Sequence, residues 1–166
     1  MQTRLKKGEK MKKTILVLIV IAAATGLMAM DYGTGIGVRG GLSNGITVKH
    51  FINEKTAVEG LLSSRWGGLN ITGLYQIHNA AAFDVQRLNW YYGIGAHIGF
   101  WSGKDADWAD DDKDYTVIGI DGIIGIEYNF EELPFNIGLD WKPAFNLSGN
   151  TEFWGDGGAL SLRFVF

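Results

Sequence analysis

Alternation between hydrophobic and polar positions dominates the second half of the chain. In Leu88–Trp101, one face carries apolar and aromatic side chains at every second residue, and the other carries small or polar ones. Strict alternation predicts a β-strand, because successive side chains of a strand point to opposite faces. The same period of two continues in Thr116–Phe130, Phe135–Leu147 and Gly157–Phe166. These segments are longer than the strand of about 5–6 residues that is usual in globular proteins.

The preceding part of the chain, from residue 34 onward, shows the same alternation in a weaker form. Two residues break it, His50 on the apolar face and Leu61 on the polar face. Gly- and Asn-containing turns and longer polar loops separate the segments, and no stretch after residue 30 has a helical period. The sequence therefore predicts eight antiparallel strands in up-and-down order. The four strands of this part are expected at Thr34–Leu42, Ile46–Ile52, Ala57–Trp66 and Leu69–His78.

The composition of the two faces indicates which one points inward. The polar face consists mostly of Gly, Ser, Ala and Asn with a few charges, whereas a soluble barrel would cover its outside with many Lys and Glu. The apolar face carries aromatic residues near both ends of the strands, as in the two aromatic girdles of a transmembrane barrel. In hydrocarbon such a sheet must close, because unpaired strand edges are not tolerated. The expected fold is therefore all-β, an eight-stranded antiparallel up-and-down transmembrane β-barrel. One girdle is expected at Trp90, Tyr92, Tyr128, Phe130, Phe135, Phe164 and Phe166, and the other at Trp66, Phe100, Trp141 and Phe145.

The first 29 residues have the organisation of a secretory signal peptide. Lys12 and Lys13 precede an apolar run, and small residues lead to an expected cleavage site after Ala29. The apolar run is shorter than the ~20 residues of a membrane-spanning helix. Met11 is the more natural initiator, because the ten residues before it are polar. The barrel domain is therefore expected to cover residues 30–166.

Composition and charge exclude several functions. The chain has no Cys, which rules out disulfides, thiolate metal sites and cysteine catalysis. Its net charge of −3 combines a basic leader with a body of net charge −8, which disfavours nucleic-acid binding. Glycine is abundant, with 24 residues, which suits a crowded interior.

The final segment 158–166, with alternating apolar residues and a terminal Phe166, completes a recognisable set of features. Together with the signal peptide and the eight strands, it resembles the small outer-membrane β-barrels of bacteria, of the OmpX and OmpA transmembrane-domain type. The resemblance implies a monomer in contact with outer-membrane lipids, with both termini in the periplasm and the loop 102–115 outside the cell. It also implies that the barrel-assembly machinery recognises the last strand through Phe166.

The resemblance leaves the function open among three classes. The first is a non-enzymatic structural, envelope or surface-contact role, the second a narrow porin-like pore for ions or small solutes, and the third a lipid-modifying barrel enzyme. We expect no catalytic, cofactor or metal site. Gly35–Gly40 matches a dinucleotide-binding motif but lies within a strand, and the acidic loop 104–114 lacks the spacing of a calcium loop. His78 and His97 point inward, and His50 points outward with no nucleophile motif beside it.

Charged residues on the inward face form the remaining candidate feature. Their charges nearly balance, and isolated buried charges cost several kcal/mol, so we expect them to pair across the middle of the barrel. Tyr91, Gln76 and the histidines are expected to link the pairs. An interior this narrow is filled by such side chains, which predicts a plugged lumen. The inward charges are Arg39, Lys49, Arg65, Lys142 and Arg163 against Glu59, Asp121, Glu127 and Asp140.

Overall fold

The computed structural model describes residues 32–65, 67–80, 82–102, 114–149 and 151–166. The expected signal peptide, Trp66 and most of the acidic loop lie outside the described residues. A 3-10 turn, η1, covers Ala82–Asp84, and all other elements are strands. No helix in the described part of the chain is long and apolar enough to cross a membrane. The strands are β1 (Thr34–Gly41), β2 (Asn44–Asn53), β3 (Thr56–Arg65), β4 (Gly68–Asn79), β5 (Leu88–Ser102), β6 (Asp114–Asn129), β7 (Phe135–Trp141), β8 (Ala144–Ser148), β9 (Phe153–Trp154) and β10 (Gly158–Val165).

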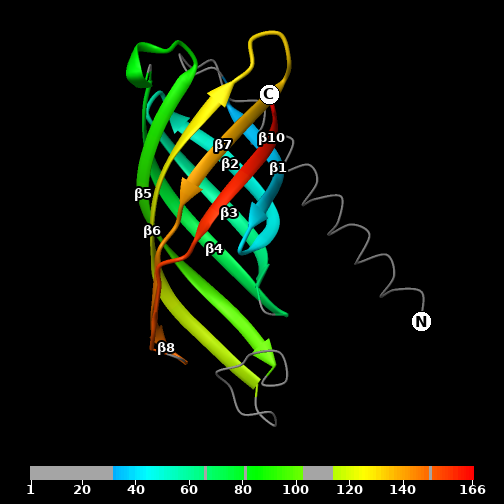
Figure 1. Cartoon of the computed structure of the whole chain (residues 1–166), viewed down its shortest axis with the longest axis vertical. Coiled ribbons are helices and arrows are strands. Elements are labelled where there is room, and N and C mark those ends of the chain that lie inside the picture. Colours follow the sequence, from blue (N-terminus) through cyan, green and yellow to red (C-terminus); the bar gives the residue numbers. More distant parts are fainter. Residues whose placement is uncertain (1–31, 66, 81, 103–113, 150) are drawn as a thin grey trace, which may run out of the picture.

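The strands form a closed antiparallel barrel (Figure 1). From β1 to β6, each strand pairs with the next along the chain. The barrel closes because β10 pairs with β1 on one side and with β7 on the other, and β7 pairs with β6. The predicted eight-stranded antiparallel barrel is confirmed.

The predicted strand Phe135–Leu147 is divided into β7 and β8, and the register along β6 continues from β7 into the start of β8, shifting only near the end of β8, between Gly119 and Ile118. Trp141 lies opposite Ile124 and Ala144 lies opposite Asp121, so no residue is inserted between them. Pro143 has no backbone N–H and cannot donate to the ladder, which interrupts the regular pairing at this point. Its carbonyl still accepts a hydrogen bond from the backbone N–H of Gly122, at 2.9 Å. β7 and β8 together therefore act as one strand of the wall.

The two ends of the barrel differ. One end, here called the Phe166 rim, carries the start of β1, the turns after β2, β4 and β6, and the end of β10. The backbone N–H of Gly33 and that of Thr34 both donate to the carbonyl of Phe166. At the opposite rim, the long β5–β6 hairpin extends past the β1–β2 turn, with β8 beside it (Figure 1). The short β9 pairs with β8, so the wall is tallest on this side.

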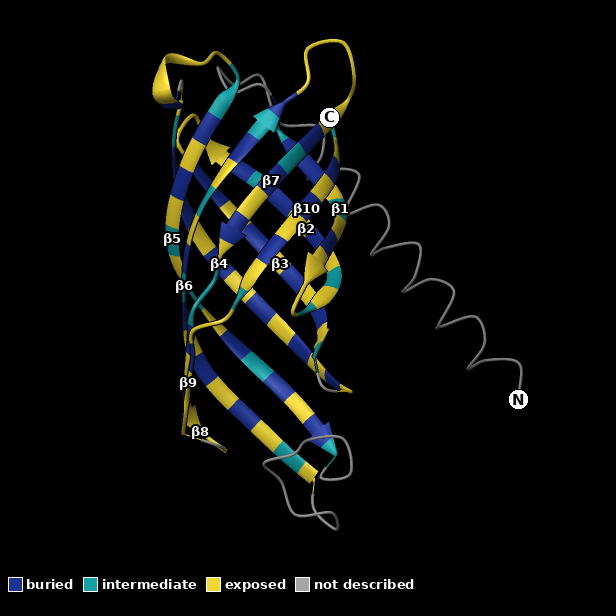
Figure 2. Ribbon diagram, in the orientation of Figure 1, coloured by how far each residue is buried: buried dark blue, intermediate teal, exposed yellow. Residues whose placement is uncertain are grey.

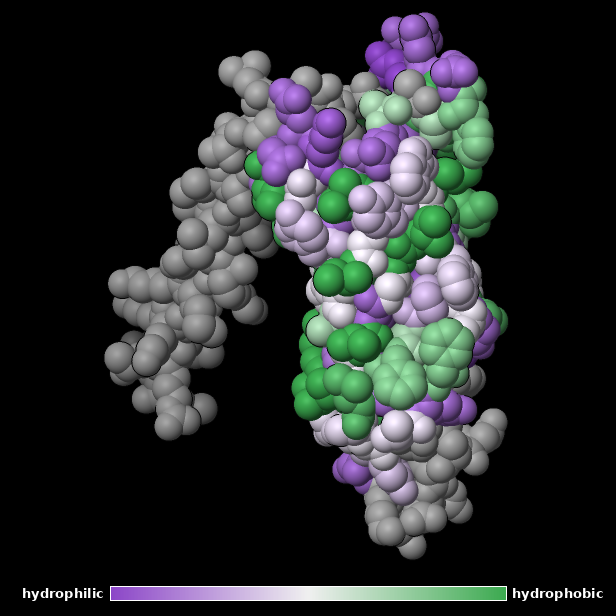
Figure 3. Space-filling model, turned by 90° about the vertical axis from the view of Figure 1, so that its left-hand side faces the viewer, coloured by the Kyte–Doolittle hydropathy of each residue, from purple (hydrophilic) through white to green (hydrophobic). Residues whose placement is uncertain are grey.

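Burial follows the predicted alternation along nearly every strand (Figure 2). In β4, every second residue from Gly68 to His78 is buried, and the residues between them are exposed or half-buried. The exposed positions are mainly large apolar side chains, and the buried ones are mainly polar. Figure 3 shows hydrophobic side chains spread over the wall around β5 and β6, with hydrophilic ones gathered mostly toward the ends. The barrel is thus apolar outside and polar inside.

Glycines on the inward face make room for the side chains that fill the interior. A Cβ added at Gly125 would meet Asp140 Cβ, the Leu139 carbonyl and Tyr91 Cζ, each at 2.7 Å. We expect Gly125→Ala to lower the free energy of unfolding by about 1–3 kcal/mol, the usual cost of overpacking. Urea unfolding of the folded protein in detergent measures the change. Gly60→Ala is the matched control, because nothing lies within 4 Å of its added Cβ, and an equal loss in both variants would contradict the steric explanation.

Candidate functional site

A cluster of buried charges in the Phe166 half of the barrel centres on the guanidinium of Arg163. Its Nη2 donates to Glu59 Oε1 at 2.7 Å, and its Nη1 donates to Asn136 Oδ1 at 3.0 Å. Thr47 Oγ1 accepts from Arg163 Nε at 3.3 Å and donates to Glu59 Oε1 at 2.5 Å. Gln76 Nε2 donates to the other Glu59 oxygen at 2.5 Å. These groups come from five strands, β2, β3, β4, β7 and β10, so their bonds tie opposite parts of the wall together.

Lys49 connects this cluster to a second carboxylate, that of Glu127. The Lys49 ammonium lies 2.9 Å from Glu127 Oε2 and 3.8 Å from Glu59 Oε2. It also lies 4.0 Å from the centroid of the Tyr91 ring, a cation–π arrangement. Tyr32 caps the cluster near the Phe166 rim, and its hydroxyl donates to Glu127 Oε1 at 3.1 Å. Two cations thus face two carboxylates in a space that excludes solvent.

Arg39 and Asp140 form a separate, bidentate ion pair. Arg39 Nη1 and Nη2 donate to the two carboxylate oxygens of Asp140, each at 2.5 Å. Both side chains are almost completely buried, with exposed fractions of 1% and 0%. The Tyr91 hydroxyl donates to Asp140 Oδ2 at 3.2 Å. Tyr91 therefore contacts both this pair and Lys49, as the sequence predicts for a linking residue.

A third group lies toward the opposite rim, around Asp121. Lys142 Nζ donates to Asp121 Oδ1 at 2.5 Å, and His97 Nδ1 lies 2.8 Å from Asp121 Oδ2. The other ring nitrogen of His97 lies 3.1 Å from Asn146 Oδ1. The Trp154 indole stacks on the His97 ring, at 6.1 Å between centroids, and covers the group on the side of the opposite rim. Four predicted inward cations are therefore paired with the four predicted carboxylates, which confirms the predicted pairing. The pairs form three groups along the height of the barrel and not one network across its middle.

Arg65 differs from the other four cations that the sequence places on the inward face, because it does not join these groups. It stands at the end of β3, where its Nη2 donates to Asp156 Oδ2 at 2.5 Å. This bond lowers the pKa of the Asp156 carboxyl below its ordinary value. The pair therefore stabilises the fold fully at pH values above the ordinary pKa of an aspartate. This stabilisation is lost as the pH falls through the lowered pKa of Asp156. Because 52% of the Asp156 side chain is exposed, the pair is worth only about 0–1 kcal/mol.

Apolar layers inside the barrel complete its closure, and the alternation of the sequence does not reveal them. Leu61, Leu74, Tyr91 and Ile123 pack together at mid-height. Leu61, which breaks the sequence pattern, is buried to 2% exposure because it fills this layer. A second apolar layer, toward the opposite rim, consists of Trp101, Val117, Ala144 and Trp154.

The remaining candidate residues occupy the positions that the sequence predicts. His78 is buried beside Gln76 and stacks on Tyr91, at 4.8 Å between ring centroids. Gly35–Gly40 lies within β1, with no helix after it. The described residues contain no group of three or more His, Asp or Glu side chains that could hold a metal ion.

The outward His50 has a partner that the sequence pattern does not reveal. Thr34 lies directly opposite it on β1, and the Thr34 hydroxyl oxygen is 2.8 Å from His50 Nδ1. Within the described part of the chain, no carboxylate forms an ion pair with His50. The hydroxyl and the imidazole are therefore a cross-strand pair without the third group that would orient the ring in a catalytic triad.

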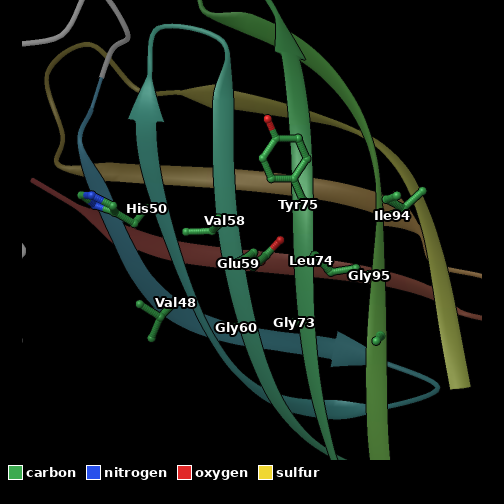
Figure 4. Close-up of a pocket in the computed structure, with 11 residues that line it drawn as sticks. Val48, His50, Val58, Glu59, Gly60, Gly73, Leu74, Tyr75, Ile94 and Gly95 are labelled. Atoms are coloured by element: carbon green, nitrogen blue, oxygen red, sulfur yellow. The ribbon is translucent and has the colours of Figure 1, made fainter. Parts of the chain in front are cut away.

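An open groove of about 740 Å³ runs across the outer face of β2–β5 beside His50 (Figure 4). Its floor is one row of paired residues, Val48, Gly60, Gly73 and Ala96. A Cβ added at Gly60 or Gly73 would have no neighbour within 4 Å, so the groove exists because these outward positions lack side chains. The signal for it in the sequence is the presence of two glycines on the apolar parity of neighbouring strands.

Comparisons with known proteins add no relative to this picture. No family model, curated protein or solved structure matches the chain. The observations that bear on function are therefore the paired charges inside the barrel, the apolar outer face and the groove.

Proposed function

We propose that the chain is an integral outer-membrane β-barrel with a structural, envelope or surface-contact role and no enzymatic activity. The observation that carries the proposal is the inverted distribution of polarity. Large apolar side chains such as Ile94 and Val38 are 73% and 59% exposed, whereas Arg163, Lys49 and Gln76 have no exposure. Water would disfavour such an outer surface, while a bilayer favours it.

The proposed orientation follows the OmpX and OmpA transmembrane-domain type of barrel. The Phe166 rim faces the periplasm, and the tall β5–β6 side with its loop extends outside the cell. The outward aromatic residues support the presence of an interface at the Phe166 rim. The rings of Phe135 and Phe164 pack edge to face there, with centroids 5.9 Å apart. The ring centroids of Phe164 and Phe166 are 6.1 Å apart. In this proposal, the barrel-assembly machinery binds the last strand through Phe166, and the protein is a monomer.

The filled interior favours a structural role over the alternative of a narrow pore. The four cation–carboxylate pairings and the two apolar layers occupy the described interior at several heights. Moving an ion through would require separating buried pairs, and leaving a buried charge without its partner costs several kcal/mol. The lipid-modifying alternative finds little support, because the Thr34–His50 pair lacks an orienting acid among the described residues.

Cell fractionation tests the location. We expect the protein in the outer-membrane fraction, with different gel mobilities before and after boiling, because a closed barrel remains folded in detergent until it is heated. Recovery as a soluble periplasmic species would contradict the proposal.

Planar-bilayer recording on the purified, folded protein tests whether the lumen is closed, and we expect no steady conductance. A steady conductance that changes with Arg39→Ala would instead favour the pore.

A further inference from the structure

His50 is exceptional among the residues on the outer face. Of all His, Asp, Glu, Lys and Arg residues in the described strands, only His50 and Asp114 lie on the outward parity. Asp114 is the first residue of β6, at the opposite rim, whereas His50 lies within β2. If the proposed function holds, His50 faces the bilayer, and an ionisable group in that position marks a functional site more often than a packing site.

The groove and His50 belong to one continuous feature. Next to the floor, on the side of the Phe166 rim, runs a second row of paired outward residues, His50, Val58, Tyr75 and Ile94. All four line the groove. The Tyr75 hydroxyl points toward the end of the barrel where β2 turns into β3, as Figure 4 shows. The groove therefore has an apolar floor toward the middle of the wall and two polar groups, an imidazole and a phenol, along its edge toward the Phe166 rim.

The hydrogen bonds of His50 leave one of its ring nitrogens available. Nδ1 is occupied by the Thr34 hydroxyl, which fixes the orientation of the ring. Nε2 has no partner among the described residues, and the side chain is only half-buried. A polar ligand at the groove can therefore reach Nε2 without breaking the Thr34 contact.

We propose that this groove binds one phospholipid of the periplasmic leaflet. An acyl chain lies on the floor formed by Gly60, Gly73 and Ala96, and the phosphate accepts a hydrogen bond from His50 Nε2, while the Tyr75 hydroxyl faces the headgroup region two strands away. The order of polarity along the groove carries this assignment. It is apolar toward the middle of the wall and polar toward the Phe166 rim, which is the order of tail and headgroup in a lipid of that leaflet.

A second copy of the chain fits the groove less well than a phospholipid. In the described strands, the outer face of another barrel offers apolar side chains, and its His, Asp, Glu, Lys and Arg residues are only a second His50 and Asp114, which lies at the opposite rim. A phospholipid provides both a flexible apolar chain and an anionic acceptor. The inference rests on the proposed membrane location, which fractionation and heat-dependent gel mobility test independently.

Native mass spectrometry of the full protein, purified from membranes in mild detergent, measures the binding. The probe is palmitoyl-oleoyl phosphatidylglycerol, added at increasing concentration. We expect one tightly bound molecule for the wild type and about tenfold weaker binding for Gly73→Leu, because leucine fills the floor and displaces apolar contact. Gly122→Leu is the matched control, since Gly122 also faces outward but lies on β6, outside the groove, and it should bind like the wild type.

A second variant separates the headgroup contact from the apolar floor. His50→Phe should weaken phosphatidylglycerol binding about tenfold, because it removes a hydrogen bond to a charged group. It should leave binding of palmitoyl-oleoyl glycerol, which has the same chains and no phosphate, unchanged.

Equal phosphatidylglycerol binding by the wild type and Gly73→Leu would overturn the groove assignment. If all variants still show heat-dependent gel mobility, the barrel proposal stays intact. Dimers that Gly73→Leu abolishes would show that a second copy occupies the groove instead.

Discussion

Replacing Asp140 with Ala is expected to lower the free energy of unfolding by about 3–5 kcal/mol, the usual cost of leaving one member of a buried ion pair alone. Arg39 would keep its charge in a position with 1% exposure, and both of its 2.5 Å contacts would be lost. The Tyr91 hydroxyl would lose its acceptor as well. Equilibrium unfolding in urea, followed by gel mobility of the folded form in detergent or vesicles, measures the change.

Two further variants show whether the loss comes from the unpaired charge. Asp156→Ala breaks the exposed pair with Arg65 and should cost about 0–1 kcal/mol. The double variant Arg39→Met/Asp140→Leu removes both charges, and it should recover most of the stability, because apolar replacement of a whole buried pair is often neutral or stabilising. A double variant as unstable as Asp140→Ala would indicate that packing volume, and not charge, determines the effect.

The barrel was predictable because one face of its sheet is apolar and the other polar, so that polarity alternates along the sequence with a period of two residues. That period repeats over segments long enough to fix the strands and to assign each residue to a face. The assignment placed Arg39 and Asp140 on the same inward face, and charge balance then required them to find partners. Which cation pairs with which carboxylate was not predictable, because this depends on how far each strand slides along its neighbour and on the curvature of the closed sheet.

The features that the sequence analysis missed depend on contacts across the barrel or across a row of strands. Leu61 breaks the alternation because Leu74 and Ile123 reach the same height from other strands and form an apolar layer with it. Arg65 has the inward parity, but its height at the end of β3 brings it to Asp156. The groove requires Gly60 and Gly73 to be paired in register, and a register becomes visible only once the strands are paired.

The apolar outer face gives the sharpest distinction between a membrane barrel and a soluble one. Ile120 is 52% exposed in the middle of β6, and its neighbour in the next strand is Phe145. Arginine at the lipid-facing midplane of a barrel costs about 2–4 kcal/mol, so Ile120→Arg should reduce the folded fraction in vesicles by that free energy. In water the same substitution at an exposed position would change stability by less than about 0.5 kcal/mol.

Leu133→Arg is the control for that experiment. Leu133 is 55% exposed, slightly more than Ile120, but it lies in the turn between β6 and β7 at the Phe166 rim. The penalty for arginine falls to about 0–1 kcal/mol near the membrane interface, so this variant should fold almost like the wild type. A large loss for Ile120→Arg together with a small loss for Leu133→Arg would locate the bilayer on the middle of the wall. Equal, small losses in both variants would mean that water surrounds the barrel, and the membrane proposal would then fail together with the lipid assignment of the groove.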